Sequence, residues 1–301
     1  MNDLIIIGGG PAGLTAAVYA IRKRLDVLLI SPDLGGKTNW HMFFADNMEH
    51  YQVINGNEIV NRFKSQIEYL EFSRKLEYCE KVDPIIGGFV VKTREGNRYE
   101  TKAVILATGA RPTKLDVPGE KKYLLRGLAY SAVSYAPLFI NRTVAVVGNG
   151  ELGIKSALEL AQSARQVYLI IPTISVLDNV LGKKVKDSKN ISIMAGHSVK
   201  EIKGDETYAR SIVVTKGSEE MELEVEATFV ELNLTPNSEC VAQVVKLNEK
   251  KQVMINSNNC SSQPGIFAAG DVADTYAEQV LISIGEGAKA ALSAYEYILS
   301  L

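Results

Sequence analysis

The chain has 301 residues and a formal net charge of -2 at pH 7, and 46% of its residues are hydrophobic. This length predicts about two domains with full hydrophobic cores, and the nearly balanced charge argues against nucleic acid or an anionic membrane surface as the main partner. The sequence has neither an apolar run of about 18 residues nor a signal-peptide pattern. We therefore expect a cytoplasmic protein that neither spans a membrane nor binds nucleic acid.

The three cysteines, Cys79, Cys240 and Cys260, are far apart in the sequence and form no C-x-x-C pair. The three histidines are scattered as well, so neither residue type has the spacing of metal ligands. We expect no metal site and no structural disulfide, and ordinary packed or surface roles for these side chains.

The first twenty residues contain the clearest motif of the chain. Leu4–Ile7 form a short apolar run, which is typical of a strand buried on both faces of a parallel sheet. Gly8, Gly10 and Gly13 follow as G-x-G-x-x-G, and an Ala-rich helical pattern begins directly after them. Such glycines permit a tight turn, the close approach of a pyrophosphate and close packing of helix on sheet. The pattern indicates a dinucleotide site, and the alternative is an ordinary Gly-rich turn between a strand and a helix.

The next segments continue an α/β pattern. Leu25–Ser31 is the expected second strand, and Asp33 at its end is a candidate acid for ribose hydroxyl groups. Trp40, the only tryptophan, is a candidate to pack on a flat ring or, equally, in the core. Further expected elements are a helix over 57–75, short strands over 76–101 and a buried strand over 103–112.

A second unit of the same kind begins at residue 143. The strand Thr143–Val147 precedes Gly148, Gly150 and Gly153, whose offsets repeat those of the first motif. A helix follows, and then the strand Gln166–Ile171. Two such units in one chain suggest two dinucleotide-binding domains related by duplication.

The C-terminal part returns to the first domain. Residues 191–233 alternate strand-like runs with charged turns, and residues 265–299 supply a buried strand, a Gly270-Asp271 turn and a long amphipathic helix. This helix needs a core to pack on, and the first domain is its natural partner. The expected domain bounds are 1–114 and 245–301 for the first domain and 115–244 for the domain inserted in it.

Five short stretches occur in a fixed order along the chain: GGGPAG at 8–13, ATGA at 107–110, the second G-x-G-x-x-G at 148–153, TPN at 235–237 and GIFAAGD at 265–271. With them the chain resembles the low-molecular-weight thioredoxin reductase family over essentially its whole length. The resemblance implies an α/β fold of two Rossmann-like, three-layer dinucleotide-binding domains, the second inserted into the first. It also implies FAD in the discontinuous first domain, NADPH in the inserted domain, and a homodimer.

The same resemblance assigns the residues that hold FAD. Lys37 stands where the family often has Gln, and Asp271 should hydrogen-bond the ribityl chain. The backbone of Gln279 and Val280 should face the pyrimidine end of the flavin. Glu278 replaces the family's Arg before this Gln, and brings a carboxylate toward the flavin's polar edge or, equally, to a solvated surface. The full set is Gly8, Gly10, Pro11, Ala12, Gly13, Lys37, Asn47, Ala107, Thr108, Gly109, Gly270, Asp271, Gln279 and Val280.

The redox motif of the family is altered in this chain. Aligned without a gap from the second glycine motif, the family's C-x-x-C-D falls on residues 131–135, where Ser131 and Ser134 replace both cysteines and Tyr135 replaces the acid. A serine hydroxyl cannot form a disulfide, because that chemistry needs a sulfur that ionises readily. This stretch therefore exchanges no disulfide. The tyrosine favours natural divergence over two serines engineered to trap a state.

The NADPH motif is altered as well. The family's basic H-R-R-x-x-x-R cluster, which clamps the 2′-phosphate, is replaced by residues 171–177, which contain no cation. Glu231 stands where the family has the alanine of A-x-G, and Glu151 adds negative charge to the second glycine turn. Each lost arginine–phosphate pair removes about 1.5–3 kcal/mol of binding. We therefore do not expect tight NADPH binding.

These features lead to one main hypothesis and two alternatives. The main hypothesis is an FAD-dependent oxidoreductase that takes electrons from a ferredoxin-like or flavodoxin-like donor and passes them to an unidentified acceptor. The first alternative is a ferredoxin–NADP reductase of the same fold, which predicts basic residues where 171–177 has none. The second is a non-catalytic flavin-binding protein that acts as an interaction partner or redox sensor. Tyr130 and Tyr135 are candidates to pack on the flavin or, equally, in the core.

Overall fold

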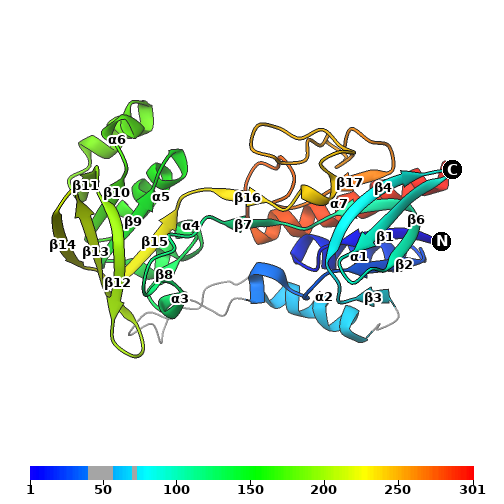
Figure 1. Cartoon of the computed structure of the whole chain (residues 1–301), viewed down its shortest axis with the longest axis horizontal. Coiled ribbons are helices and arrows are strands. Elements are labelled where there is room, and N and C mark those ends of the chain that lie inside the picture. The colour runs from blue at the N-terminus through cyan, green and yellow to red at the C-terminus, as the bar shows by residue number, and fades with distance from the viewer. Residues whose placement is uncertain (40–56, 70–72) are drawn as a thin grey trace. The chain divides into compact units, whose positions relative to one another are not determined.

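The computed structural model describes residues 1–39, 57–69 and 73–301. These residues form two compact units (Figure 1): the first comprises the described residues up to Arg111 together with Thr235–Leu301, and the second comprises Pro112–Leu234. The expected bounds assigned residues 235–244 to the inserted domain. In the structure, Cys240 and Val241 pack into a core of the first unit, which is why the chain rejoins that unit at Thr235.

The first unit is built on a seven-stranded sheet, whose strands are β1 (Asn2–Ile7), β2 (Val27–Ile30), β3 (Arg74–Lys75), β4 (Cys79–Ile85), β5 (Gly88–Thr93), β6 (Arg98–Leu106) and β17 (Ile266–Ala268). The spatial order is β3-β2-β1-β6-β5-β4, with β17 paired to β6. The pairs among β3, β2, β1, β6 and β17 are parallel. β5 pairs with β6, and β4 with β5, in antiparallel fashion. The buried strand expected over 103–112 ends at Leu106, and residues 107–109 form the turn after it.

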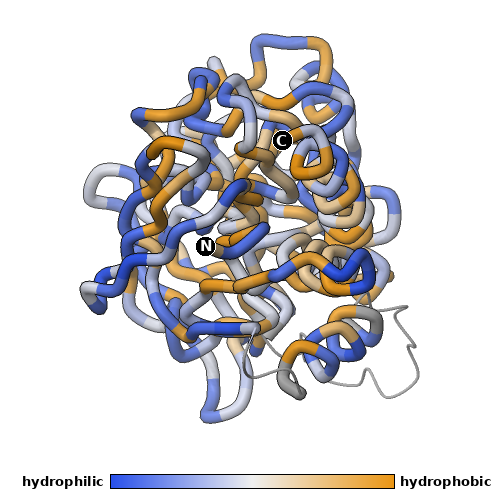
Figure 2. The backbone as a smooth tube through the Cα atoms, turned by 90° about the vertical axis from the view of Figure 1, so that its right-hand side faces the viewer, coloured by the Kyte–Doolittle hydropathy of each residue, from blue (hydrophilic) through white to orange (hydrophobic). Residues whose placement is uncertain are grey.

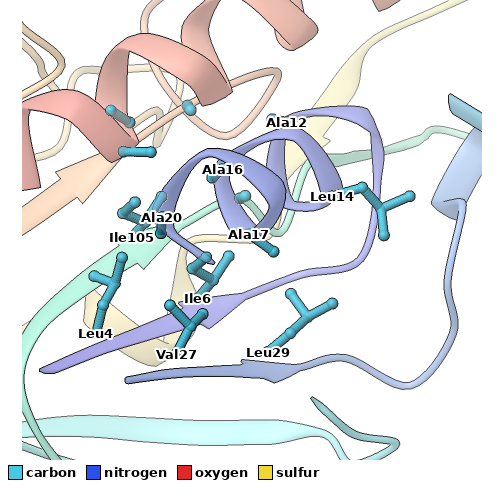
Figure 3. Close-up of a cluster of buried hydrophobic side chains, with 14 of the residues drawn as sticks. Leu4, Ile6, Ala12, Leu14, Ala16, Ala17, Ala20, Val27, Leu29 and Ile105 are labelled. Atoms are coloured by element: carbon cyan, nitrogen blue, oxygen red, sulfur yellow. The ribbon is translucent and has the colours of Figure 1, made fainter. Parts of the chain in front are cut away.

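Among its described residues, this unit has the α-helices α1 (Pro11–Arg22), α2 (Asn57–Tyr69) and α7 (Val280–Leu299). α1 and α7 pack together over the sheet, and alternate strand residues such as Leu4, Ile6 and Ile105 form the core beneath them (Figure 3). Gly287 allows this close approach, because a Cβ atom there would lie 2.1 Å from the Ala12 carbonyl oxygen. The C-terminal helix therefore packs on the first domain, as the sequence predicts.

The second unit contains a five-stranded parallel sheet in the spatial order β11 (Ile191–Ala195), β10 (Gln166–Ile171), β9 (Thr143–Gly148), β15 (Ala227–Glu231) and β8 (Leu128–Ala129). The layers on its two faces are the helices α5 (Glu151–Ala161) and α6 (Val180–Asp187), and the antiparallel strands β12 (Ser198–Gly204), β13 (Ala209–Lys216) and β14 (Glu219–Glu224). Val144 and Val146 of β9 pack with the helices, whereas Ala145 and Val147 pack with the antiparallel strands. The predicted fold class, two Rossmann-like three-layer α/β domains, is confirmed.

Shorter elements complete the described chain: α3 (Glu120–Tyr123), α4 (Ala132–Tyr135), and the paired strands β7 (Ala110–Pro112) and β16 (Leu234–Pro236). Hydrophobic and hydrophilic residues are interspersed along the backbone (Figure 2). Accordingly, no helix in the described segments is both long and apolar enough to cross a membrane.

Candidate functional site

The carboxyl ends of three neighbouring parallel strands define the candidate site of the first unit. Ile7 ends β1, Leu106 ends β6 and Ala268 ends β17, and the three residues are aligned across the sheet. Ligands of open α/β sheets bind at this edge, where the turns that leave the strands converge. Here those turns carry the predicted site residues of 8–13, 107–109 and 270–271.

The first glycine turn has the geometry that a bound pyrophosphate needs. Gly8 has a φ of +110°, and a Cβ atom there would lie 2.2 Å from the Ala107 carbonyl oxygen. A Cβ atom at Gly13 would lie 1.8 Å from the Gly8 carbonyl oxygen. At Gly10, by contrast, a Cβ atom would meet no heavy atom of the described residues within 4 Å. The turn is therefore closed where strand and helix pack, and open at the middle glycine.

The open glycine stands at the start of α1. Gly10 is the N-cap of the helix, Pro11 is its first residue, and no side chain from the described part of the chain caps it. The first N–H groups of the helix and its dipole therefore favour an anion at this position. The predicted contacts Gly8, Gly10, Pro11 and Gly13 thus lie in one turn, whose geometry fits a pyrophosphate.

The end of β2 supports this turn from the side. The Gly9 N–H donates to Ser31 Oγ at 2.8 Å, and the Gly36 N–H donates to Asp33 Oδ1 at 2.8 Å. A Cβ atom at Gly36 would lie 3.2 Å from Gly10 Cα. Asp33 therefore orders the Gly-Gly turn beside the open glycine, and its role toward a ribose stays a prediction. Sequence reasoning missed Ser31, although a hydroxyl at the end of a buried apolar strand signals a polar partner.

Two predicted site residues from distant parts of the chain form an ion pair. Lys37 Nζ lies 2.6 Å from Asp271 Oδ2, and the Asp271 side chain is only 11% exposed. Ser283 Oγ of α7 donates to the other carboxylate oxygen at 3.4 Å. The preceding residue, Gly270, has a φ of +73°, and a Cβ atom there would lie 3.1 Å from the Ala12 side chain. These contacts bring residues 12, 37, 270 and 271 of the predicted set together.

The turn after β6 is held by a residue outside the predicted set. Thr108 Oγ1 donates to the Asn237 carbonyl oxygen at 2.6 Å, and Asn237 Nδ2 donates to the Thr108 carbonyl oxygen at 2.9 Å. The Asn237 N–H also donates to the Gly109 carbonyl oxygen at 2.9 Å. Arg111 in turn donates to Asn237 Oδ1 at 2.5 Å. The TPN motif therefore orders the predicted residues Thr108 and Gly109 from behind.

The N-terminus of α7 completes the predicted set. Gln279 is the N-cap, Val280 is the first helical residue, and among the described residues no side chain caps the helix. Its first N–H groups are therefore left for another acceptor, and the contact of Gln279 and Val280 with a flavin stays a prediction. Glu278 is exposed in the structure, and desolvation and then the nearby Asp271 carboxylate raise its pKa. Asn47 and Trp40 lie outside the described residues.

The second glycine turn keeps the shape of the first. A Cβ atom at Gly148 would lie 2.7 Å from Gly153 Cα, and at Gly150, the N-cap of α5, it would meet no heavy atom of the described chain within 4 Å. Glu151 at the start of α5 forms an exposed ion pair with Lys155 at 2.7 Å. After β10, the chain forms a 3-10 turn over Ile174–Leu177, whose N-cap side chain accepts from the Ser175 N–H. The turn geometry is retained, and the sequence of residues 171–177 holds no cation.

The altered redox stretch and the altered A-x-G motif meet in the structure. Glu231 ends β15, is 3% exposed, and accepts a hydrogen bond from the Ala132 N–H at 2.5 Å. Ser131 is the N-cap of α4 and Ser134 lies within this helix. Their hydroxyl oxygens lie 2.9 Å apart and share a hydrogen bond. Sequence reasoning singled out both departures but missed their contact. The available signal was an acid at the end of an apolar strand, which needs a partner when buried.

Tyr130 precedes this stretch and Tyr135 ends it, and both side chains make their contacts within the second unit. The Tyr130 hydroxyl donates to Glu120 Oε1 at 2.9 Å, and burial raises the pKa of Tyr130. Tyr135 packs against the core formed by α5 and the parallel sheet, and burial raises its pKa too. These contacts support the core interpretation of both rings. Within the described segments, no cluster of three or more His, Cys, Asp or Glu residues could hold a metal ion.

Comparison with known protein families gives a match over most of the chain. The profile described as pyridine nucleotide-disulphide oxidoreductase matches residues 2–287. A subunit of the alkyl hydroperoxide reductase of Staphylococcus aureus strain Mu50 is 34% identical to the chain over 304 aligned positions. That alignment covers 99% of this chain and 59% of the relative, so the chain spans about three fifths of the length of the curated relatives it matches.

Solved structures support the same relationship. The thioredoxin reductase of Streptococcus pyogenes MGAS5005 superposes with a TM-score of 0.89 at 28% identity, covering 100% of this chain and 99% of that chain. A ferredoxin-flavin thioredoxin reductase from Clostridium acetobutylicum superposes with a TM-score of 0.51 at 26% identity, covering 99% and 98%.

Proposed function

Because the chain belongs to the pyridine nucleotide-disulphide oxidoreductase family, among its thioredoxin reductase-like members, we propose that it is an FAD-dependent oxidoreductase that works without a dithiol and without NADPH. Its electron donor in this proposal is a ferredoxin-like or flavodoxin-like protein. Its acceptor is reduced directly at the flavin. We further propose a cytoplasmic homodimer.

The residues of the first unit fit FAD. The open position at Gly10 and the start of α1 suit the pyrophosphate, and the Asp271 carboxylate suits donors such as ribityl hydroxyl groups. The N–H groups at the start of α7, at Gln279 and Val280, suit the carbonyl groups of a flavin ring. When bound there, FAD supplies the transfer of electrons, and the protein supplies binding, orientation and charge.

The observation that carries the proposal is the hydrogen bond between Ser131 and Ser134. Two side chains at the family's cysteine positions lie within 2.9 Å of each other, yet both end in hydroxyl groups. A hydroxyl group has no accessible disulfide state, so electrons cannot pass through this pair. Glu231 adds to this, because its carboxylate orders the same stretch through the Ala132 N–H.

The second unit supports a donor other than NADPH. Its glycine turn is intact, but the residues that follow β10 are apolar or hydroxylic, and Glu151 at the start of α5 is an acid. A 2′-phosphate would find no arginine among residues 171–177, and the pyrophosphate at the glycine turn would face the like charge of Glu151. The protein from C. acetobutylicum, named a ferredoxin-flavin thioredoxin reductase, gives a structural precedent for a ferredoxin donor in this fold.

The test is a comparison of donors on the purified, FAD-loaded protein under anaerobic conditions. The expected result is rapid loss of the oxidised flavin spectrum with a reduced ferredoxin or flavodoxin, and slow or no loss with NADH and NADPH. A thioredoxin substrate should not be reduced with any donor. Disulfide reduction of thioredoxin by the wild-type chain contradicts the proposal, and so does the absence of bound flavin after loading.

A further inference from the structure

Two cysteines that are far apart in the sequence meet in the first unit. Cys79 begins β4, and Cys240 lies in the 3-10 turn Glu239–Val241, which packs against β4. Both side chains lie in one hydrophobic cluster, and the Cys240 side chain is near enough to raise the pKa of Cys79. Cys240 is 8% exposed and Cys79 is half-buried, and both pack in the same core as Val82. The sequence predicts packed or surface roles for these cysteines, and the structure adds that Cys79 and Cys240 share one core.

The surroundings of the two thiols favour an unreactive reduced form. The Cys240 side chain, and then burial, raise the pKa of Cys79 above its ordinary value. The first thiol to react is the half-buried one, because an external reagent can reach Cys79 while Cys240 is covered. Because the raised pKa keeps the Cys79 thiolate scarce near pH 7, formation of a disulfide should be slow.

The segment that carries Cys240 also supports the flavin site. Glu239 pairs with Arg111 at 2.6 Å, and Asn237 holds Thr108 through two hydrogen bonds. A bond between Cys79 and Cys240 would fasten this segment to β4 at the edge of the sheet. A disulfide at this place would therefore also restrict the segment that orders Thr108.

We propose that Cys79 and Cys240 form a reversible disulfide by exchange with a low-molecular-weight disulfide. The Cys79 thiol loses its proton to water, and its sulfur attacks one sulfur of the external disulfide, which releases one thiolate. The Cys240 sulfur, after losing its proton, attacks the Cys79 sulfur and releases the second thiolate. The two cysteines give up two electrons, and the external disulfide takes them up to become two thiols.

The decisive experiment maps the cysteines of the intact chain after oxidation. The wild-type protein is incubated with oxidised glutathione, the remaining thiols are alkylated, and the peptides are analysed by mass spectrometry. The expected product is one linked peptide pair containing Cys79 and Cys240, which dithiothreitol separates again. If both cysteines are found alkylated, or each is found as a separate glutathione adduct, the proposal is overturned.

Variants test the order of the two steps. Cys240→Ser should stop at a glutathione adduct on Cys79, whereas the matched control Cys260→Ser should form the same linked pair as the wild type. The rate should rise between pH 7 and pH 9, because the attacking thiol has a raised pKa and its thiolate fraction grows with pH. Oxidation should raise the Tm of wild type and Cys260→Ser by about 5 °C. An equal rise in Cys240→Ser would contradict a bond between these two residues.

Discussion

In both glycine turns, the space for a side chain differs from one glycine to the next. At Gly10 and Gly150 an added Cβ atom would meet no heavy atom of the described chain within 4 Å, while at Gly8 and Gly13 backbone fills this space. The tight glycines are needed for the turn to fold at all. The open ones leave room for a ligand, and this difference makes a direct test at residue level.

Gly10→Ala should weaken FAD binding without affecting the fold. The added methyl group meets no atom of the described residues within 4 Å, and the φ of -74° is ordinary for alanine, so stability should be unchanged. The methyl group would stand where the pyrophosphate approaches, and FAD affinity should fall at least about tenfold, or roughly 1.4 kcal/mol. Flavin fluorescence titration measures this.

The matched control is Gly150→Ala, which adds a methyl group at the equivalent N-cap of the second turn. It should leave FAD affinity unchanged. An equal loss in both variants would show that the effect is not local to the first turn, and an unchanged affinity in Gly10→Ala would remove this turn from the flavin site.

Glu231→Ala should destabilise the second unit. The substitution leaves the buried Ala132 N–H without its acceptor, which costs about 1–3 kcal/mol of unfolding free energy. Glu231→Gln keeps a carbonyl oxygen at this position and should lose less. Urea denaturation of both variants measures the difference. A Gln variant that is as unstable as the Ala variant would mean that the hydrogen bond is not what Glu231 contributes.

At the scale of elements, the close approach of α1 and α7 holds the first unit together. The two helices touch where Gly287 faces the Ala12 carbonyl oxygen, and the same Ala12 lies beside Gly270 in the candidate site. Packing and site geometry are therefore linked through one residue. Any change that separates the helices also shifts the turn that carries Asp271.

Two glycines of α7 should respond in opposite directions to alanine. Gly287→Ala places a Cβ atom 2.1 Å from backbone, so the helices must move apart, at about 1–3 kcal/mol. Gly285→Ala adds a Cβ atom that meets no described atom within 4 Å, and should stabilise the helix by about 0.5–1 kcal/mol, because alanine loses less backbone entropy. Thermal melting of the two variants, side by side, measures both signs. A stabilising Gly287→Ala would contradict the close packing described for this pair of helices.

The strands and both glycine turns could be predicted from the sequence because they depend on neighbouring residues. An apolar run, a glycine triplet and a small-residue helix all lie within about twenty positions, and their meaning is local. The Lys37–Asp271 and Glu231–Ala132 contacts could not be predicted, since each joins residues that only the folded chain brings together. The proximity of Cys79 and Cys240 in one core could not be predicted for the same reason. The chain's return at Thr235 depended on the packing of Cys240 and Val241, which no local pattern reveals.

At the scale of the whole molecule, the two units differ in how well their residues fit the ligands that the family resemblance implies. The first unit combines an open glycine turn, an ion-paired Asp271 and two helix starts with available N–H groups. The second keeps its fold and its glycine turn, while hydroxyl groups occupy the positions of the family's cysteines and no arginine stands in residues 171–177. We base on this contrast our proposal of a flavoprotein that uses neither a dithiol nor NADPH.

The response of the flavin to NADPH tests most directly the proposal that this protein takes its electrons from another donor. The FAD-loaded wild-type protein is mixed anaerobically with one equivalent of NADPH, and the visible absorbance of the oxidised flavin is followed in a stopped-flow instrument. A parallel sample receives a reduced ferredoxin and shows that the flavin can be reduced. The account predicts that the absorbance persists with NADPH and is lost with the reduced ferredoxin, whereas rapid bleaching by one equivalent of NADPH would contradict it.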